Sequence, residues 1–154
     1  MKRSFSLVEL IVVVAIVGIG IGLFYSVLVV NWVSLEKQVS LVDLQMEADK
    51  ISEAISADGR LARLITITGA GKNVLFSLPA DLGPTVTYSI AANGEISKDS
   101  GSGSYVISRY LDYNSCSFAR EGNALLANLS LVDDVFGQRL RLAVSIRIFP
   151  RNLL

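Results

Sequence analysis

Glu9 has the most specific chemical setting in this sequence, because it is a carboxylate inside an apolar run. No other charged side chain lies between Arg3 and Glu36. A charged side chain at the bilayer midplane costs about 2.5–3.5 kcal/mol on insertion scales, and less near the edge. We therefore expect a cation beside Glu9, and Lys2 and Arg3 are the nearest candidates in the chain.

Cleavage of the chain before Phe5 would supply a more specific cation. The new α-amine would have a pKa of about 8 and would be charged at neutral pH. Phe5 lies one helical turn before Glu9, which makes the pair awkward within one helix, but a staggered neighbouring helix could bring its amine to Glu9. Such an ion pair would fix the register of a helical assembly, a role that buried charges have in other proteins.

Catalytic chemistry has little support in the sequence. The 154 residues include no histidine, which excludes a Ser-His-Asp triad and histidine metal sites. The single cysteine, Cys116, cannot form a disulfide within the chain. We expect a buried or idle thiol there, with a nucleophile and an intermolecular disulfide as the weaker alternatives. The sequence predicts that the protein is not an enzyme and carries no cofactor.

Oxygen ligands that calcium could bind are available at two places in the sequence. Asp99 begins a loop of serine and glycine, and Asp133 and Asp134 are adjacent. Neither place has the spacing of an EF-hand, and acidic residues in turns are more often turn formers. We therefore predict no metal site and keep calcium at these aspartates as the weaker alternative.

Positive and negative side chains balance, with 14 Lys and Arg against 14 Asp and Glu. A general electrostatic contact with nucleic acid is not expected at zero net charge. A basic stripe nevertheless follows the last part of the chain and comprises Arg139, Arg141, Arg147 and Arg151. We interpret it as a solvated outer strand face, with a contact to an acidic neighbouring subunit as the alternative.

The apolar run after Glu9 is the element that must position this carboxylate. Residues 10–30 carry no charge and would form a helix of about 30 Å, the thickness of a bilayer core. A cleaved secretory signal peptide is disfavoured, because the run is too long and no A-x-A site follows it. Lys2 and Arg3 precede the run, so we expect a cytoplasmic N-terminus, a single span in lipid and an extracytoplasmic remainder.

Helical periodicity continues beyond the apolar run. Residues 31–57 form an amphipathic continuation, and we expect the helix to run from Phe5 to about Ala57 and to stop at Asp58 and Gly59. One apolar stripe is predicted to pack against the head domain and comprises Leu35, Val39, Val42, Met46, Ile51 and Ile55.

Residues 58–154 are expected to form a β-rich globular head. Alternating apolar and polar residues predict strands near 60–68, 74–78, 85–90, 95–98, 105–111, 117–120, 124–132 and 138–149. The last two are predicted to form a hairpin that turns at 133–137. The sequence therefore predicts an α+β fold, in which a long N-terminal α-helix, transmembrane in its first half, packs on an antiparallel β-sheet head.

Residues 2–10, Lys-Arg-Ser-Phe-Ser-Leu-Val-Glu-Leu, together with the apolar run, resemble the class III signal of type IV pilins and type II secretion pseudopilins. The resemblance implies a leader of residues 1–4, cleavage between Ser4 and Phe5 by a prepilin peptidase, and N-methylation of Phe5. It also implies that Glu9 is the assembly glutamate. Ser4 stands where the family usually has glycine.

Three glycines, Gly18, Gly20 and Gly22, interrupt the apolar helix. Glycine in a helix interior costs about 1 kcal/mol relative to alanine. The resemblance implies a helix that can loosen in this region. Close helix packing through Gly18 and Gly22, or simple tolerance of glycine in a membrane helix, are the alternatives.

The resemblance implies a minor pilin or minor pseudopilin of a bacterial inner membrane. Such a subunit assembles into, or caps, a type IV pilus or a type II secretion pseudopilus. Its partners would be other pilin or pseudopilin subunits, the prepilin peptidase, the inner-membrane assembly platform and membrane lipid. The β-rich head after one helix looks similar to J-type minor pseudopilins and PilW-like minor pilins. The alternative is a single-pass, membrane-anchored extracytoplasmic binding module, such as an adhesin or sensor, outside any filament.

Overall fold

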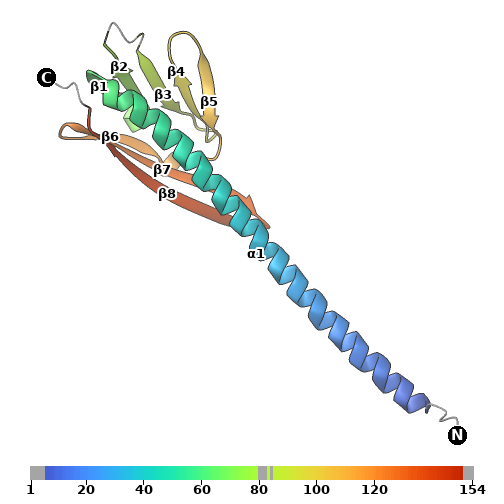
Figure 1. The fold of residues 1–154 in the computed structure, drawn as a ribbon. Helices are drawn as coiled ribbons and strands as arrows, with labels where there is room; N and C mark the ends of the chain where they lie inside the picture. Colours follow the sequence, from blue (N-terminus) through green and yellow to red (C-terminus); the bar gives the residue numbers. More distant parts are fainter. Residues whose placement is uncertain (1–5, 80–82, 84, 151–154) are drawn as a thin grey trace. The chain divides into compact units, whose positions relative to one another are not determined.

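The computed structural model describes residues 6–79, 83 and 85–150. Its first described element is a single continuous helix, α1 (Leu7–Leu61), and strands form most of the remaining regular structure (Figure 1). The chain divides into two compact units, residues 1–39 and 40–154. The first unit contains the apolar part of α1. The second contains the remainder of the helix together with the strands.

In the described part of the second unit, the strands form two antiparallel sheets. The first sheet has the order β1-β2-β3-β4-β5, with β1 (Leu64–Thr68), β2 (Asn73–Ser77), β3 (Val86–Ile90), β4 (Ile96–Asp99) and β5 (Ser104–Ser108). The second has the order β6-β7-β8, with β6 (Ser117–Glu121), β7 (Ala124–Val135) and β8 (Gln138–Ile148). Short 3-10 helices occur at η1 (Gly69–Gly71) and η2 (Tyr113–Ser115).

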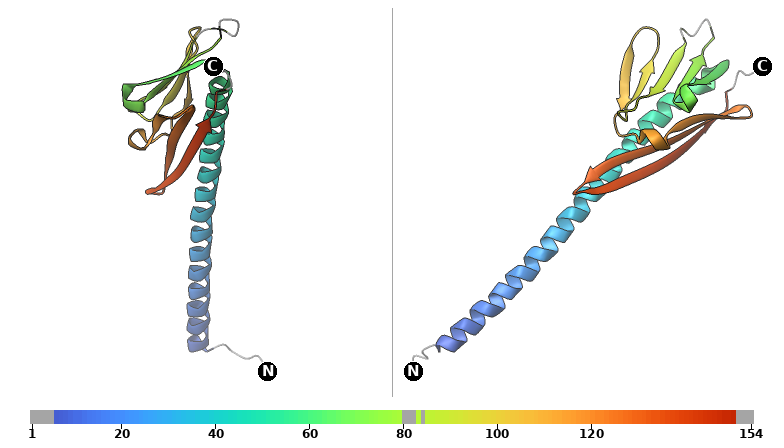
Figure 2. Two further views of the ribbon diagram at one scale, coloured as in Figure 1. Left: turned by 90° about the vertical axis from the view of Figure 1, so that its left-hand side faces the viewer. Right: turned by 180° about the vertical axis from the view of Figure 1, so that it is seen from behind.

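The predicted fold class is confirmed, since one long helix packs on antiparallel strands in an α+β, pilin-like architecture. Figure 2 shows the strands on one side of the C-terminal part of α1. The single predicted sheet is replaced by two sheets because the chain leaves β5 after Ser108. The backbone N–H of Asp112 donates to the carbonyl of Ser130 at 2.8 Å, and Leu111 forms a single bridge with Leu131. The strand predicted at 105–111 is therefore cut short.

The face of α1 that packs on the sheets differs from the predicted stripe. The prediction was wrong for Leu35, Val39, Val42 and Met46, which are 53–60% exposed. The buried face is instead formed by Ser40, Leu44, Ala48, Ile51, Ile55 and Gly59. Three of these six side chains are small, and small side chains let the strands approach the helix closely. The prediction assigned a series of large apolar residues to the packed face of the helix. N-terminal to Ile51, this choice gave the wrong face.

Gly59 shows how close this approach is. A Cβ added at Gly59 would lie 3.0 Å from Cγ2 of Ile148 and 3.4 Å from Cε1 of Phe76. The predicted helix stop at Asp58 and Gly59 is therefore wrong, because this glycine serves packing within the helix. The helix ends at Leu61, and Arg63 then donates its N–H to the carbonyl of Ser77 as β1 begins.

The β7–β8 hairpin is longer than predicted. Its turn consists of Phe136 and Gly137, with φ angles of 51° and 73°. Asp133 and Asp134, predicted as turn residues, are strand residues opposite Leu140 and Arg139. The predicted alternation in β8 is confirmed: its even-numbered apolar side chains from Leu140 to Ile148 are buried or half-buried, and the odd-numbered side chains between them are exposed.

Replacing Ile51 by alanine tests the assignment of the buried face. Ile51 has no exposed surface, so Ile51→Ala is expected to lower the free energy of unfolding by about 2–5 kcal/mol. The matched control is Val42→Ala, on the exposed face, with an expected change within about 0.5 kcal/mol. Chemical denaturation of the full chain in detergent measures both. Equal losses at the two positions would contradict the assignment.

Candidate functional site

The start of α1 places Glu9 at the third helical position. Ser6 caps the helix, since its hydroxyl accepts a hydrogen bond from the N–H of Val8 at 3.3 Å and its carbonyl accepts one from Leu10 at 3.2 Å. Ser6 and Glu9 therefore have the S-x-x-E spacing of a capping box. Glu9 also lies near the positive end of the helix dipole, where a carboxylate is stabilising by about 0.3–1 kcal/mol. This placement of Glu9 at the helix start was not predicted, although the S-x-x-E spacing is visible in the sequence.

Glu9 is exposed, and so are the apolar side chains that follow it. From Leu7 to Val30 the large apolar side chains are 44–75% exposed. By its length and composition, the helix is apolar and long enough to cross a membrane. Continuous apolar surface of this extent marks a contact with lipid or with other proteins. The candidate site is therefore a carboxylate in the first turn of a helix whose large apolar side chains are exposed.

The helix is continuous through Gly18, Gly20 and Gly22. A Cβ at any of these positions would meet nothing within 4 Å, so packing within the chain does not require glycine there. The hydroxyl of Ser26 donates to the carbonyl of Gly22 at 2.9 Å, a bond that can bend a helix slightly. Loosening of the helix at these glycines stays a prediction.

The cleavage site predicted between Ser4 and Phe5 lies outside the residues that the structure describes. Ser4 and Phe5, together with Lys2 and Arg3, are outside the described residues. The described chain begins at Ser6, whose hydroxyl accepts the hydrogen bond from the N–H of Val8. Cleavage and methylation at Phe5 therefore stay predictions.

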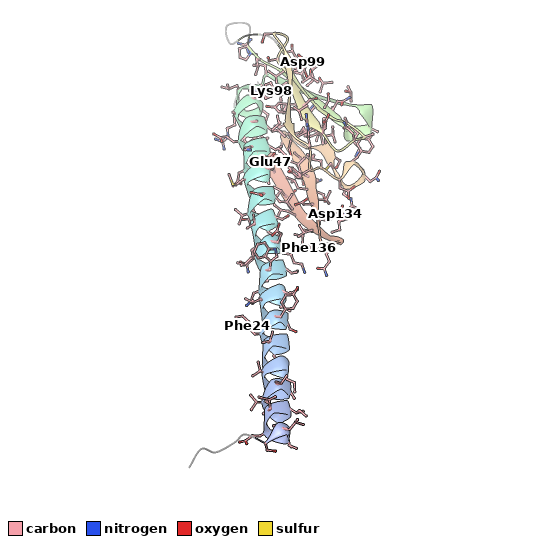
Figure 3. The ribbon with its side chains drawn as sticks, turned by 90° about the vertical axis from the view of Figure 1, so that its right-hand side faces the viewer. Phe24, Glu47, Lys98, Asp99, Asp134 and Phe136 are labelled. Carbon is pink, nitrogen blue, oxygen red and sulfur yellow. The ribbon has the colours of Figure 1, made fainter. Side chains whose placement is uncertain are left out.

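The three aspartates considered for calcium do not come together. Figure 3 shows Asp99 and Asp134 at opposite ends of the second unit. Asp133 accepts a hydrogen bond from the hydroxyl of Ser40 at 2.5 Å, and this bond joins α1 to β7. Within the described part of the chain, no group of three or more Cys, Asp or Glu side chains is placed to hold a metal ion.

Two arginines of the predicted basic stripe form ion pairs within the chain. Arg141 pairs with Asp112, and Arg147 pairs with Glu121 at 3.3 Å. The hydrogen bond from Ser115, together with the charge of Arg141, lowers the pKa of Asp112. Arg151 lies outside the described residues. These pairs support the interpretation of a solvated strand face more than a contact reserved for a neighbour.

Cys116 is buried, as predicted, with 1% of its surface exposed. Its sulfur accepts a hydrogen bond from the N–H of Ser130 at 3.1 Å, and burial raises the pKa of the thiol. The ammonium of Lys72 donates to the carbonyls of Cys116 and Tyr113 and lies 4.3 Å from the centre of the Tyr113 ring. The cysteine thus sits in a packed structural region.

The polar cluster of Asp58, Tyr88 and Lys98 was missed by the sequence analysis. The hydroxyl of Tyr88 donates to Oδ2 of Asp58 at 2.6 Å, and Nζ of Lys98 lies 2.7 Å from the same oxygen. Tyr88 is fully buried. The cluster fixes the end of α1 to β3 and β4. Asp58 gave only a helix-stop signal, because its partners are 30 and 40 residues further along the chain.

Comparison with known families finds one match, the prokaryotic N-terminal methylation motif, at residues 1–25. Comparisons with curated proteins and with solved structures find no match. The chain therefore carries a type IV pilin-class N-terminal signal, and its described fold is pilin-like. The motif covers the leader, Glu9 and most of the apolar run, and it indicates a pilin-like substrate of prepilin peptidase.

The titration of Tyr88 gives a test of the polar cluster. Burial, with the hydrogen bond to Asp58, raises the pKa of Tyr88 far above its ordinary value of 10.0. The folded chain keeps this proton where the unfolded chain loses it, so this stability is present below pH 10 and falls as the pH rises above it. The expected slope is about 1.4 kcal/mol per pH unit for one proton.

Tyr88→Phe removes the titrating group, so its free energy of unfolding should lack this fall. At pH 7 the variant should be less stable by about 1.5–3 kcal/mol, the range for a hydrogen bond to a charged group. The difference between the two proteins should then shrink above pH 10. Denaturation in urea from pH 7 to 11 measures it. Tyr110→Phe, at a tyrosine that is 43% exposed, is the control. A difference independent of pH would refute the role of the cluster.

Proposed function

We propose that this protein is a minor pilin or minor pseudopilin. It is made as a precursor in the bacterial inner membrane, with its head outside the cytoplasm. Prepilin peptidase removes residues 1–4 and methylates Phe5, and the mature chain assembles into, or caps, a type IV pilus or type II secretion pseudopilus. The observation that carries the proposal is the coincidence of the methylation motif with an exposed apolar helix that has Glu9 in its first turn.

The extent of the exposed apolar face supports assembly over simple anchoring. Lipid can cover the side chains of residues 10–30. Val42 and Met46 are also more than half exposed, and Met46 follows Val30 by 16 residues, or about 24 Å of helix. Lipid in the same bilayer core does not reach that far. The helices of neighbouring pilin or pseudopilin subunits would cover both parts of this face.

The charge at the start of the helix supports the role of Glu9. A terminal amine on Phe5 would lie two residues before Leu7, at the positive end of the helix dipole. Its positive charge would be unfavourable there without a carboxylate nearby. Glu9 is exposed, so it is available to the amine of a neighbouring subunit. The pair would neutralise two charges in apolar surroundings and would set the axial register.

Assembly, in this proposal, replaces chemical turnover. Several polar side chains of the described head are engaged in contacts that hold the fold: the Asp58 cluster, the Lys72 contacts and the Asp112 pair. The proposal therefore includes no enzyme activity, cofactor or resident metal. Its remaining partners are the prepilin peptidase and the inner-membrane assembly platform.

Processing is the first test. In cells that contain prepilin peptidase, mass spectrometry of the extracted protein should find an N-terminus at methylated Phe5. Cells without the peptidase provide the control and should yield the uncleaved chain. Ser4→Gly is expected to be cleaved at least as completely, because glycine is usual before the cut. An uncleaved terminus in the presence of the peptidase would favour the anchored binding module.

The charge of Glu9 is the second test, and Glu9→Gln isolates it. Glutamine can also complete a capping box, so the helix start and membrane insertion should be retained. Incorporation into sheared filaments should fall strongly, because the partner amine loses its carboxylate. The matched control is Ser6→Ala, which weakens the cap by about 0.5–2 kcal/mol but keeps the charge. If Glu9→Gln assembles normally, or if Ser6→Ala fails equally, capping and not register is the role of Glu9.

A further inference from the structure

The turn of the β7–β8 hairpin contains an unusual residue. Phe136 has a φ of 51° and is followed by Gly137 with a φ of 73°. Two-residue hairpin turns with two positive φ angles favour Asn-Gly or Asp-Gly. A bulky residue in this left-handed region is an outlier, because its side chain crowds the backbone. Phenylalanine is therefore not the residue that the turn itself selects.

Packing does not select Phe136 either. Its side chain is 62% exposed, and it is absent from the hydrophobic core of the second unit. Figure 3 shows it at the turn end of the hairpin, beyond Asp134. Arg139 faces Asp134 across the hairpin, so the turn presents an aromatic ring beside a pair of opposite charges. A strained, exposed aromatic residue indicates a function for its side chain.

The position of the turn suggests what its partner is. The hydrogen bond between Ser40 and Asp133 places the turn at the end of the second unit where α1 enters it. Trp32, of a residue type favoured at membrane interfaces, precedes Ser40 by eight residues. That segment measures about 12 Å as a helix and at most about 29 Å fully extended. Chain length alone thus keeps this end near the surface of any membrane that holds residues 10–30.

We propose that Phe136 inserts into the lipid interface of the membrane in which residues 10–30 are anchored. This inference rests on the proposed function for the anchoring. The ring supplies apolar area at the depth where interfacial side chains bind, and the balanced charges beside it make the contact independent of anionic lipid. The contact holds the head against the bilayer before assembly, and extraction of the subunit into a filament breaks it.

The test uses tryptophan fluorescence in phosphatidylcholine vesicles. The chain has a single tryptophan, so Trp32→Phe with Phe136→Trp gives a full-length protein with one reporter, at the turn. The control protein combines Trp32→Phe with Phe149→Trp, because Phe149 is 60% exposed and follows the other end of β8. Lipids brominated near the headgroup should quench the turn reporter about twofold more than the control reporter, as expected for a ring at the interface.

Each other outcome overturns the proposal. Equal quenching of the two reporters shows that the side chain at position 136 has no preferential contact with lipid. A blue shift that depends on protein density, without bromine quenching, makes a second copy of the chain the partner. Absence of quenching of Trp32 in the wild-type protein removes the anchor, and the proposed function fails with it. Quenched Trp32 in the wild-type protein, with an unquenched turn reporter in the double variant, removes this inference alone.

Phe136→Asn supplies an independent arm. Asparagine tolerates positive φ better than phenylalanine, so the variant should have a higher midpoint of thermal unfolding. A lower midpoint would show that Phe136 supports the fold, and the strain argument would fail.

Discussion

The structure depends on one constraint: the described part of the chain leaves most of the large apolar side chains of α1 exposed. Residues 7–30 expose their large side chains, and Val42 and Met46 extend this surface on the part of the helix that belongs to the second unit. The strands cover a different face, where Ser40, Ala48 and Gly59 keep the helix narrow. Two functions are thus assigned to two faces of one helix. Small residues face the protein's own strands, and the large apolar residues of the other face are exposed.

Polar contacts then hold the strands to the helix at both ends of the packed face. Ser40 bonds to Asp133 at one end, and Asp58 binds Tyr88 and Lys98 at the other. Apolar packing alone would permit the strands to slide along the helix. The short hydrogen bonds at the two ends prevent this sliding, because each joins one particular donor to one particular acceptor. The head therefore has a fixed register on α1, which a subunit needs if its surface is to be presented at a defined place in an assembly.

Local patterns made most of the architecture predictable. The uncharged run with its lone Glu9, the methylation signal and the alternation in β8 are all readable within a few residues. Most of the failures have a common physical cause, since they depend on residues far apart in the chain. The buried helix face was misidentified because small residues pack closely only when a particular strand, ending in Ile148, lies opposite. The division into two sheets and the Asp58 cluster depend on partners that no periodicity specifies. The S-x-x-E spacing of Ser6 and Glu9 is the exception, because this pattern is local and was overlooked.

The direction of β7 and β8 has a consequence for the order of folding. Ser40 contacts Asp133 and Gly59 contacts Ile148, so the buried face of α1 packs against strand residues that follow it by 93 and 89 residues. This face of the helix is therefore synthesised long before the strands that cover it. Closing such long loops is entropically unfavourable and slow. Until then the inner face of the helix is open. Under the proposed function, residues 10–30 are in lipid at that stage, and the membrane restricts the search of the late strands to a volume around a tethered helix.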